Sequence, residues 1–222
     1  MRVALRNSME SSDAKAFIDL VTKEARRRET LLEDADPDYA YDHWMFTDLP
    51  FLHDLSLLFL VAIRHHVERR LLYHAACATG HGNAIKRAEY DVRLKALLTL
   101  PLGKRWKEID ARLNPTMCAR YKSVEALRLL ANSYKHDPRN QPDRELIVFL
   151  GLDTKLTYAT LPESGELQKG LALLVGLPDK AGYADITERF VEHAEEFLKE
   201  VQSRNLLSKV NWGRVSLIDF AH

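Results

Sequence analysis

The 222-residue sequence has few of the residues that mark fibrous, disulfide-linked or membrane-spanning proteins. Its nine Gly and eight Pro exclude a collagenous or low-complexity chain. Two cysteines, Cys77 and Cys118, are too few for a disulfide framework, and each lies in a run typical of helix, which predicts buried free thiols. The most apolar run, Leu55 to Ile63, is far shorter than the ~20 residues that span a bilayer.

Neither sign of charge is in excess, because 32 Lys and Arg balance 32 Asp and Glu and give a formal net charge of zero. This balance excludes a protein that coats nucleic acid or membranes by bulk charge, but it allows a local basic patch. The first residues, MRVALRNSMESSD, lack the apolar core of a secretory signal. We therefore expect a cytoplasmic protein with no membrane partner.

The short motifs that hold common cofactors are missing. The sequence contains no glycine-rich phosphate loop, no Gly-x-Ser-x-Gly and no Cys-x-x-Cys. His66, Arg70 and His74 recur at four-residue intervals, but an arginine between two histidines disfavours a bound cation. We expect neither a metal nor another cofactor.

Hydrophobic periodicity predicts a chain built almost entirely of helices. The expected helices cover about 11–33, 50–78, 84–100, 115–136 and 167–175. A last helix begins near Asp185, and its core face repeats Ile186, Phe190, Ala194, Phe197 and Val201. No alternation of strands and helices is present, so we predict a mainly all-α fold, a helical bundle that forms a single domain over 1–222. Two β-like runs, 145–150 and 155–161, are joined by GLDT and predict a small β-hairpin insertion over 143–162.

The helix expected over 50–78 has a first half that is apolar in every direction. At 100° per residue, Leu57, Leu58 and Phe59 point to three different sides. A helix with no polar face is typically buried on all sides. We expect this half to lie in the centre of a bundle or at a dimer interface.

The helix expected over 115–136, started by Asn114 and Pro115, has two distinct faces. On a helical wheel, Val124, Leu127, Leu130, Ala131 and Tyr134 form the core face. The opposite stripe carries Glu125, Arg128, Leu129, Asn132 and His136. This stripe is either a solvated polar face, with a cation in its last turn for dipole reasons, or one wall of a site.

Histidine, arginine and asparagine on one face suit the cleavage of a phosphodiester without a metal. Histidine exchanges protons near neutral pH, and arginine stays charged and binds phosphate oxygens with two parallel donors. In such a reaction a base removes the proton of the ribose 2′-hydroxyl, and a cation stabilises the phosphorane. His136, Arg128 and Asn132 are therefore the candidate catalytic residues.

The run LRLLANSYKHDP, from Leu127 to Pro138, resembles the motif helix of the HEPN superfamily. The run FLVAIRHHVERRLL is similar to the first helix of that family. In the family pattern, an arginine precedes a polar residue, and a histidine follows near the end of the helix. Asn132 matches the polar position and His136 the histidine, while Ala131 occupies the position of the arginine. Arg128, one turn earlier, and Arg139, just after the helix, are the candidate replacements.

The resemblance implies an all-α domain, of which many relatives are metal-independent RNases of toxin–antitoxin and phage-defence systems. It also implies a homodimer, because active HEPN domains place paired motifs in a shared basic cleft. RNA and an antitoxin protein are the further partners that the resemblance suggests. Members of the family that lack the arginine are nucleotide-binding or purely structural.

Basic residues cluster earlier in the chain, where residues 86–107 contain seven Lys and Arg and only two acids. Arg69 and Arg70 are candidates for a phosphate-binding wall. The stretch Lys104 to Lys107 combines three basic residues with Trp106, as RNA contacts do, although a tryptophan buried at the base of a loop is the alternative.

Three hypotheses follow from the sequence. The first is a HEPN-like helical protein that acts on or binds RNA. The second is a catalytically inactive helical module that binds a partner or assembles with it. The third is a protein with a small-molecule pocket between its helices.

Overall fold

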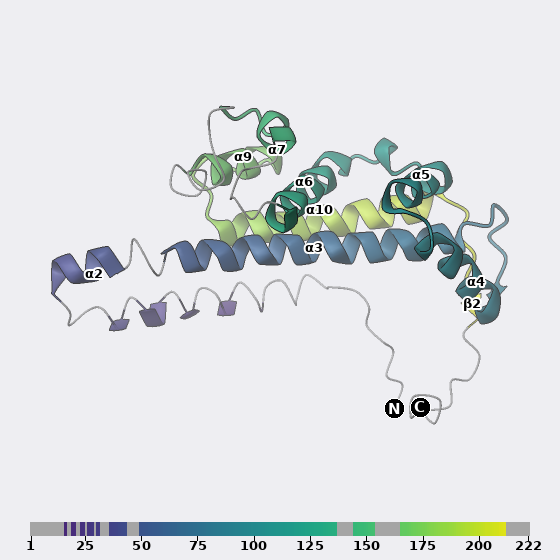
Figure 1. Ribbon diagram of the computed structural model, residues 1–222, viewed down its shortest axis with the longest axis horizontal. Coiled ribbons are helices and arrows are strands. Elements are labelled where there is room, and N and C mark those ends of the chain that lie inside the picture. The colour runs from purple at the N-terminus through teal and green to yellow at the C-terminus, as the bar shows by residue number, and fades with distance from the viewer. Residues whose placement is uncertain are drawn as a thin grey trace, which may run out of the picture. The chain divides into compact units, whose positions relative to one another are not determined.

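The computed structural model describes residues 16, 19–20, 23–24, 26–28, 30–31, 36–43, 49–136, 144–153 and 165–211; at 49–54 and 134–136 it describes the backbone alone. Helices account for most of these residues (Figure 1), which confirms the mainly all-α fold. No helix within these ranges is long and apolar enough to cross a membrane.

The helices, in chain order, are α2 (Pro37–His43), α3 (Leu49–Cys77), α4 (Arg87–Leu98), α5 (Leu102–Leu113), α6 (Tyr121–His136), α7 (Arg144–Phe149), α9 (Glu166–Leu174) and α10 (Tyr183–Arg204). A 3-10 helix, η2 (Pro115–Met117), precedes α6. The two-residue strands β1 (Ile85–Lys86) and β2 (Val210–Asn211) pair in parallel, with Ile85 opposite Val210.

The chain divides into two compact units. The first consists of Met1–His66 and Lys122–Glu195, and the second of Val67–Tyr121 and Glu196–His222. The boundaries fall inside α3 and inside α10, so each of these helices contributes residues to both units.

The core is formed by the apolar faces that the sequence pattern identified. Along α10, Ile186, Phe190 and Phe197 are fully buried, and Ala194 and Val201 lie on the same face. In α3, Leu57 and Leu60 are also fully buried, but Leu58 is 51% exposed. The first half of α3 is therefore not buried on all sides within one chain, and burial of Leu58 at a dimer interface, the other expectation, stays a prediction.

The first strand of the expected hairpin is wrong, because residues 144–149 form the helix α7. Leu146 and Ile147 are both buried while Val148 is 60% exposed, a pattern that fits a helix and not the alternation of a strand. Gly151, in the sequence read as the hairpin turn, caps the helix: its φ is 69°, and the amides of Gly151 and Leu152 donate to Val148 and Ile147. The second expected strand, 155–161, lies outside the described residues.

Asn114 ends one helix and does not start the next, which is a second correction. Its φ of 46° is left-handed, and its amide donates to the carbonyl of Asp110 at 2.9 Å, so it caps α5. Asparagine tolerates this backbone conformation better than other residues that carry a Cβ. Pro115 follows in η2, and α6 begins at Tyr121. The expected end at His136 is confirmed.

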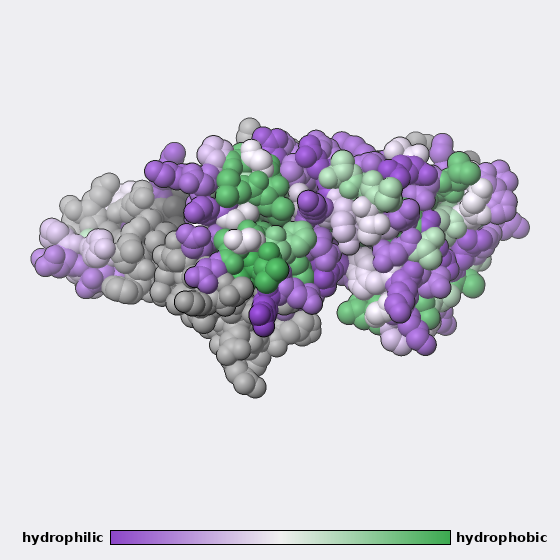
Figure 2. All heavy atoms as spheres, turned by 90° about the horizontal axis from the view of Figure 1, so that it is seen from above, coloured by the Kyte–Doolittle hydropathy of each residue, from purple (hydrophilic) through white to green (hydrophobic). Residues whose placement is uncertain are grey.

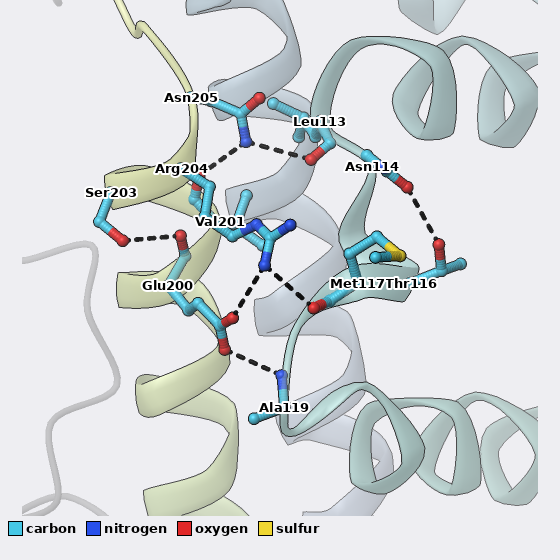
Figure 3. Close-up of polar contacts among 10 residues, drawn as sticks. All are labelled: Leu113, Asn114, Thr116, Met117, Ala119, Glu200, Val201, Ser203, Arg204 and Asn205. Atoms are coloured by element: carbon cyan, nitrogen blue, oxygen red, sulfur yellow. Dashed lines mark hydrogen bonds and ion pairs between the residues drawn. The ribbon is translucent and has the colours of Figure 1, made fainter.

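Side chains of α10 hold the connection between α5 and α6 in the second unit (Figure 3). Glu200 accepts a hydrogen bond from the amide of Ala119 at 2.9 Å, and Arg204 donates to the carbonyl of Met117 at 3.1 Å. Asn205 donates to Leu113 at 3.1 Å. These bonds satisfy backbone groups that the turn of η2 leaves without helical partners.

In the first unit, α7 and α9 pack closely because α9 contains a glycine. A Cβ at Gly170 would lie 3.2 Å from Leu150 Cβ and 3.2 Å from Leu152 Cδ2, closer than ordinary van der Waals contact. The outer sides of the two helices carry the exposed Val148 and Leu173, where Figure 2 shows a hydrophobic area.

We predict that alanine at the two helical glycines will have different effects on stability. Gly103→Ala, in α5, meets no atom within 4 Å and should raise the free energy of unfolding by about 1 kcal/mol, the helix propensity gained. At Gly170 this gain is opposed by overpacking, which typically costs about 1–3 kcal/mol. Calorimetry should give Gly170→Ala a free energy of unfolding at least ~1 kcal/mol lower than that of Gly103→Ala. Equal stabilisation by the two substitutions would contradict the close contact at Gly170.

Candidate functional site

The candidate stripe on α6 is the accessible side of a helix that is otherwise buried. Val124, Leu127, Leu130 and Ala131 are all at most 6% exposed, as the helical wheel predicted. Among the described side chains of the helix, only Tyr121, Lys122, Glu125, Arg128 and Asn132 retain appreciable exposure. Leu129, expected on the stripe, is 3% exposed and belongs to the core.

Arg128 is held by an acid one turn earlier on the same helix. Its Nε donates to the two carboxylate oxygens of Glu125 at 2.9 and 3.0 Å, and its Nη2 donates to Glu125 at 2.7 Å. A second acid, Glu145 at the start of α7, lies 3.9 Å away and is mostly exposed, so it adds little. The bidentate contact fixes the plane of the guanidinium, and it also compensates its charge.

The backbone of α6 brings three of the expected site residues onto one face. Arg128, Asn132 and His136 follow one another at four-residue intervals within a continuous helix. Asn132 is half-buried. The side chain of His136 and the whole of Arg139 lie outside the described residues. Ala131, at the position of the family's arginine, is 3% exposed and faces the core.

The remaining expected basic residues belong to the second unit. Arg69 is exposed, whereas Arg70 is half-buried and its guanidinium lies 5.7 Å from the ring centre of Tyr73. In α5, Lys104 and Lys107 are exposed, and Trp106 is half-buried. The structure therefore places the expected phosphate-binding residues of α3 in a different unit from the stripe on α6.

A buried serine–histidine hydrogen bond joins α6 to α10 within the first unit. Ser123 Oγ lies 2.8 Å from His193 Nδ1. A serine beside a histidine is the arrangement of an activated nucleophile. Both residues are at most 5% exposed, however, so a substrate cannot reach the hydroxyl. This pair is a structural contact between helices.

The end of α3 contains a buried histidine, His74, which the sequence marked only by its four-residue spacing from Arg70. His74 is 2% exposed, and neither ring nitrogen hydrogen bonds to a described residue. Its ring packs edge-on against Tyr73, which in turn contacts Tyr90 of α4. Burial, reinforced by the positive charge of Arg70, lowers the pKa of His74 to about 4. His74 is therefore neutral at physiological pH.

Two tyrosines and a thiol complete this buried cluster. Burial raises the pKa of Tyr90 to about 12 and also raises the pKa of Tyr73. The pKa of Cys77 is raised for the same reason, so the thiol stays protonated and is a poor nucleophile. Both Cys77 and Cys118 are free and buried, as the sequence predicted.

A pocket of about 350 Å³ lies in the first unit, between the loop before α10 and the first turns of that helix. Asp185, Glu188 and Glu192 supply acids to its lining, and Arg189 pairs with Glu192 at 2.8 Å. Small-molecule sites are mostly apolar with a few polar groups. This charged lining gives little support to the small-molecule hypothesis.

Comparison of the chain with family models, with curated proteins and with solved structures finds no match. Within the described ranges, no cluster of three or more His, Cys, Asp or Glu side chains is able to hold a metal ion. Function is therefore inferred from the chain's own residues.

We predict that His74 makes the protein less stable at acidic pH. The unfolded chain binds a proton at His74 near pH ~6.5, whereas the folded chain binds it only near pH 4, so the free energy of unfolding falls as the pH falls between these values. The full effect is about 3 kcal/mol. Urea unfolding of the wild type and of His74→Phe at a series of pH values should show a shallower decline in the variant.

The exposed His81 provides the control, because His81→Gln should keep the pH dependence of the wild type. If His74→Phe loses stability with the same slope as the wild type between pH 6.5 and 4, the histidine is not the group that titrates.

Proposed function

We propose that this protein is a HEPN-like helical protein that acts on RNA, as a metal-independent endoribonuclease with its site on α6. The observation that carries the proposal is the stripe on which Arg128 and Asn132 lie on the accessible side of α6, with the backbone of His136 one turn further along the same line. The resemblance of LRLLANSYKHDP to the HEPN motif supports the same residues.

The charge of α6 suits an anionic substrate. The helix carries Lys122, Arg128 and Lys135 against a single acid, Glu125, so its net charge is +2. Cations near the end of a helix are also favoured by the helix dipole. Because Glu125 fixes the guanidinium of Arg128 before substrate binds, less conformational entropy is lost when a phosphate is bound.

In the proposed reaction His136 removes the proton from the ribose 2′-hydroxyl. The 2′-oxygen attacks the adjacent phosphorus, and the bond from phosphorus to the 5′-oxygen breaks. The products are a 2′,3′-cyclic phosphate and a 5′-hydroxyl that takes up a proton. Arg128 or Arg139 stabilises the charge on the phosphorane, and Asn132 orients the phosphate. Ala131, at the position of the family's arginine, is buried and carries no charge, so the cation must come from another position.

The HEPN resemblance adds partners to the proposal. A second copy of the chain would supply the other half of a shared cleft, and an antitoxin protein would control the activity. A toxin or phage-defence enzyme of this kind acts on RNA in the cytoplasm.

A specific observation favours the second hypothesis, a catalytically inactive module that binds or assembles with a partner. Glu125 engages two nitrogens of Arg128, and Glu145 lies 3.9 Å away, so the charge available to a phosphorane is reduced. If this compensation dominates, the stripe binds a partner without cleaving it.

We predict that the purified protein cleaves labelled single-stranded RNA in the presence of EDTA and leaves 2′,3′-cyclic phosphate ends. His136→Ala should lower the cleavage rate by about 10²–10⁴-fold, because it removes the proton-transfer group. Gel analysis of the products measures both the rate and the chemistry of the ends.

Arg128→Ala should also slow cleavage, and Arg189→Ala is its matched control. Arg189 forms the same type of ion pair, with Glu192 three residues later at 2.8 Å, but it lies on α10 and not on the stripe. RNA left intact by the wild type under all these conditions would support the inactive module.

A further inference from the structure

The neutral charge of the whole chain hides an uneven distribution between the two units. Residues 67–121 and 196–222 carry fifteen Lys and Arg against eight Asp and Glu, a net charge of +7. Residues 1–66 and 122–195 carry seventeen against twenty-four, a net charge of −7. A net charge of this size on a small body creates a field strong enough to attract a polyanion.

Within the second unit, several arginines are already paired with acids. Arg87 and Arg93 of α4 pair with Asp91 and Glu89 on the same helix, and in α5 Arg112 pairs with Glu108. Five exposed lysines form no ion pair with a described residue: Lys86, Lys95, Lys104, Lys107 and Lys209. Four of these five lysines lie on β1, α4 and α5, and Lys209 directly precedes β2.

The half-buried Arg105 holds α4 and α5 together at the corner where three of these lysines lie. Arg105 Nε donates to the carbonyl of Leu97 at 3.2 Å, and its Nη2 donates to Leu98 at 2.8 Å and to Leu100 at 3.2 Å. Leu98 and Leu100 lie at and just beyond the end of α4, where carbonyls lack a following helical turn, and the carbonyl of Leu97 also accepts from the amide of Leu100 at 3.2 Å. The bonds fix the first turn of α5 against the last turn of α4 while the charge of Arg105 stays uncompensated.

The exposed lysines lie close to this anchor in the chain. Lys95 is in the last turn of α4, and Lys104 is in the first turn of α5, directly before Arg105. Lys107 follows one turn after Lys104 on the same exposed face of α5. Their ammonium groups are point charges that suit backbone phosphates, and they provide no bidentate recognition of bases.

We propose that the corner of α4 and α5 is a binding surface for the phosphate backbone of single-stranded RNA. The surface is defined by Lys95, Lys104, Arg105 and Lys107, and it binds RNA without regard to base sequence. Half-buried Trp106 beside these lysines supplies an aromatic group of the kind on which bases stack. That the bound polyanion is RNA rests on the proposed function. The surface itself belongs to a different unit from His136 and does not depend on that residue.

The test measures binding of the full-length protein to a fluorescent 2′-O-methyl RNA of 30 nucleotides. This probe has no free 2′-hydroxyl, so the proposed reaction cannot consume it. Fluorescence anisotropy at 50–200 mM KCl gives both the affinity and its salt dependence. The triple variant Lys95→Ala, Lys104→Ala, Lys107→Ala should bind at least ~10-fold more weakly, with a log–log salt slope shallower by about 2, since each phosphate contact contributes about 0.7 for a single strand.

The matched control removes the same number of exposed lysines from the first unit, as Lys23→Ala, Lys169→Ala, Lys180→Ala. Its affinity and salt slope should equal those of the wild type. Circular dichroism of both triple variants confirms that each is folded. Equal weakening by the two variants would show only an effect of net charge and would overturn the assigned surface.

Polyglutamate, a polyanion without phosphate, is the competitor that distinguishes RNA from an acidic protein. We expect polyglutamate to displace the labelled RNA poorly. Displacement by polyglutamate as effective as that by unlabelled RNA would overturn the proposal. An RNA affinity of the Lys95, Lys104, Lys107 variant equal to that of the wild type would also overturn it. Loss of binding in this variant, together with a wild type that cleaves no RNA, would refute the proposed nuclease and leave the binding surface standing.

Discussion

The burial of one face of α6 is the constraint on which any function of the first unit depends. Once Val124, Leu127 and Leu130 are in the core, the rotation of the helix is fixed. The side chains that remain accessible are then determined by the 3.6-residue repeat and not by their chemistry. Arg128 and Asn132 are accessible for that reason, and the backbone of His136 continues the same line.

Long periodic helices could be predicted from the sequence, whereas short elements and helix ends could not. The repeat that ends in Phe197 and Val201 predicted the buried face of α10, because several turns carry the same signal. The apolar run of α7 is only six residues long and fits either periodicity, and Gly151 serves as a helix cap as readily as a hairpin turn. Asn114 was misread because asparagine is favoured both at the start of a helix and in a left-handed cap.

The candidate site was predictable in its position along α6 but not in its contacts. The wheel separates Arg128 from the core, yet it also places Leu129 on the stripe, where the structure buries it. Whether Glu125 would bind Arg128 or project away depends on rotamers that spacing does not determine. Next to the buried His74, Tyr73 contacts Tyr90 of α4, a contact between segments that periodicity within α3 does not reveal.

If both proposals hold, the division into two oppositely charged units would separate the affinity for RNA from the chemistry on it. Salt screens charges beyond about 8 Å at physiological ionic strength, so a phosphate beside α6 responds mainly to nearby side chains, among them Lys122 and Arg128, and only weakly to the −7 of the whole unit. Because Glu125 compensates its charge, Arg128 would orient a bound phosphate more than attract it. Under the proposals, most of the electrostatic attraction for RNA would then come from exposed lysines such as Lys104 and Lys107. In such a nuclease, substitutions in the second unit would weaken RNA binding without slowing turnover. Substitutions on α6 would slow turnover without weakening binding.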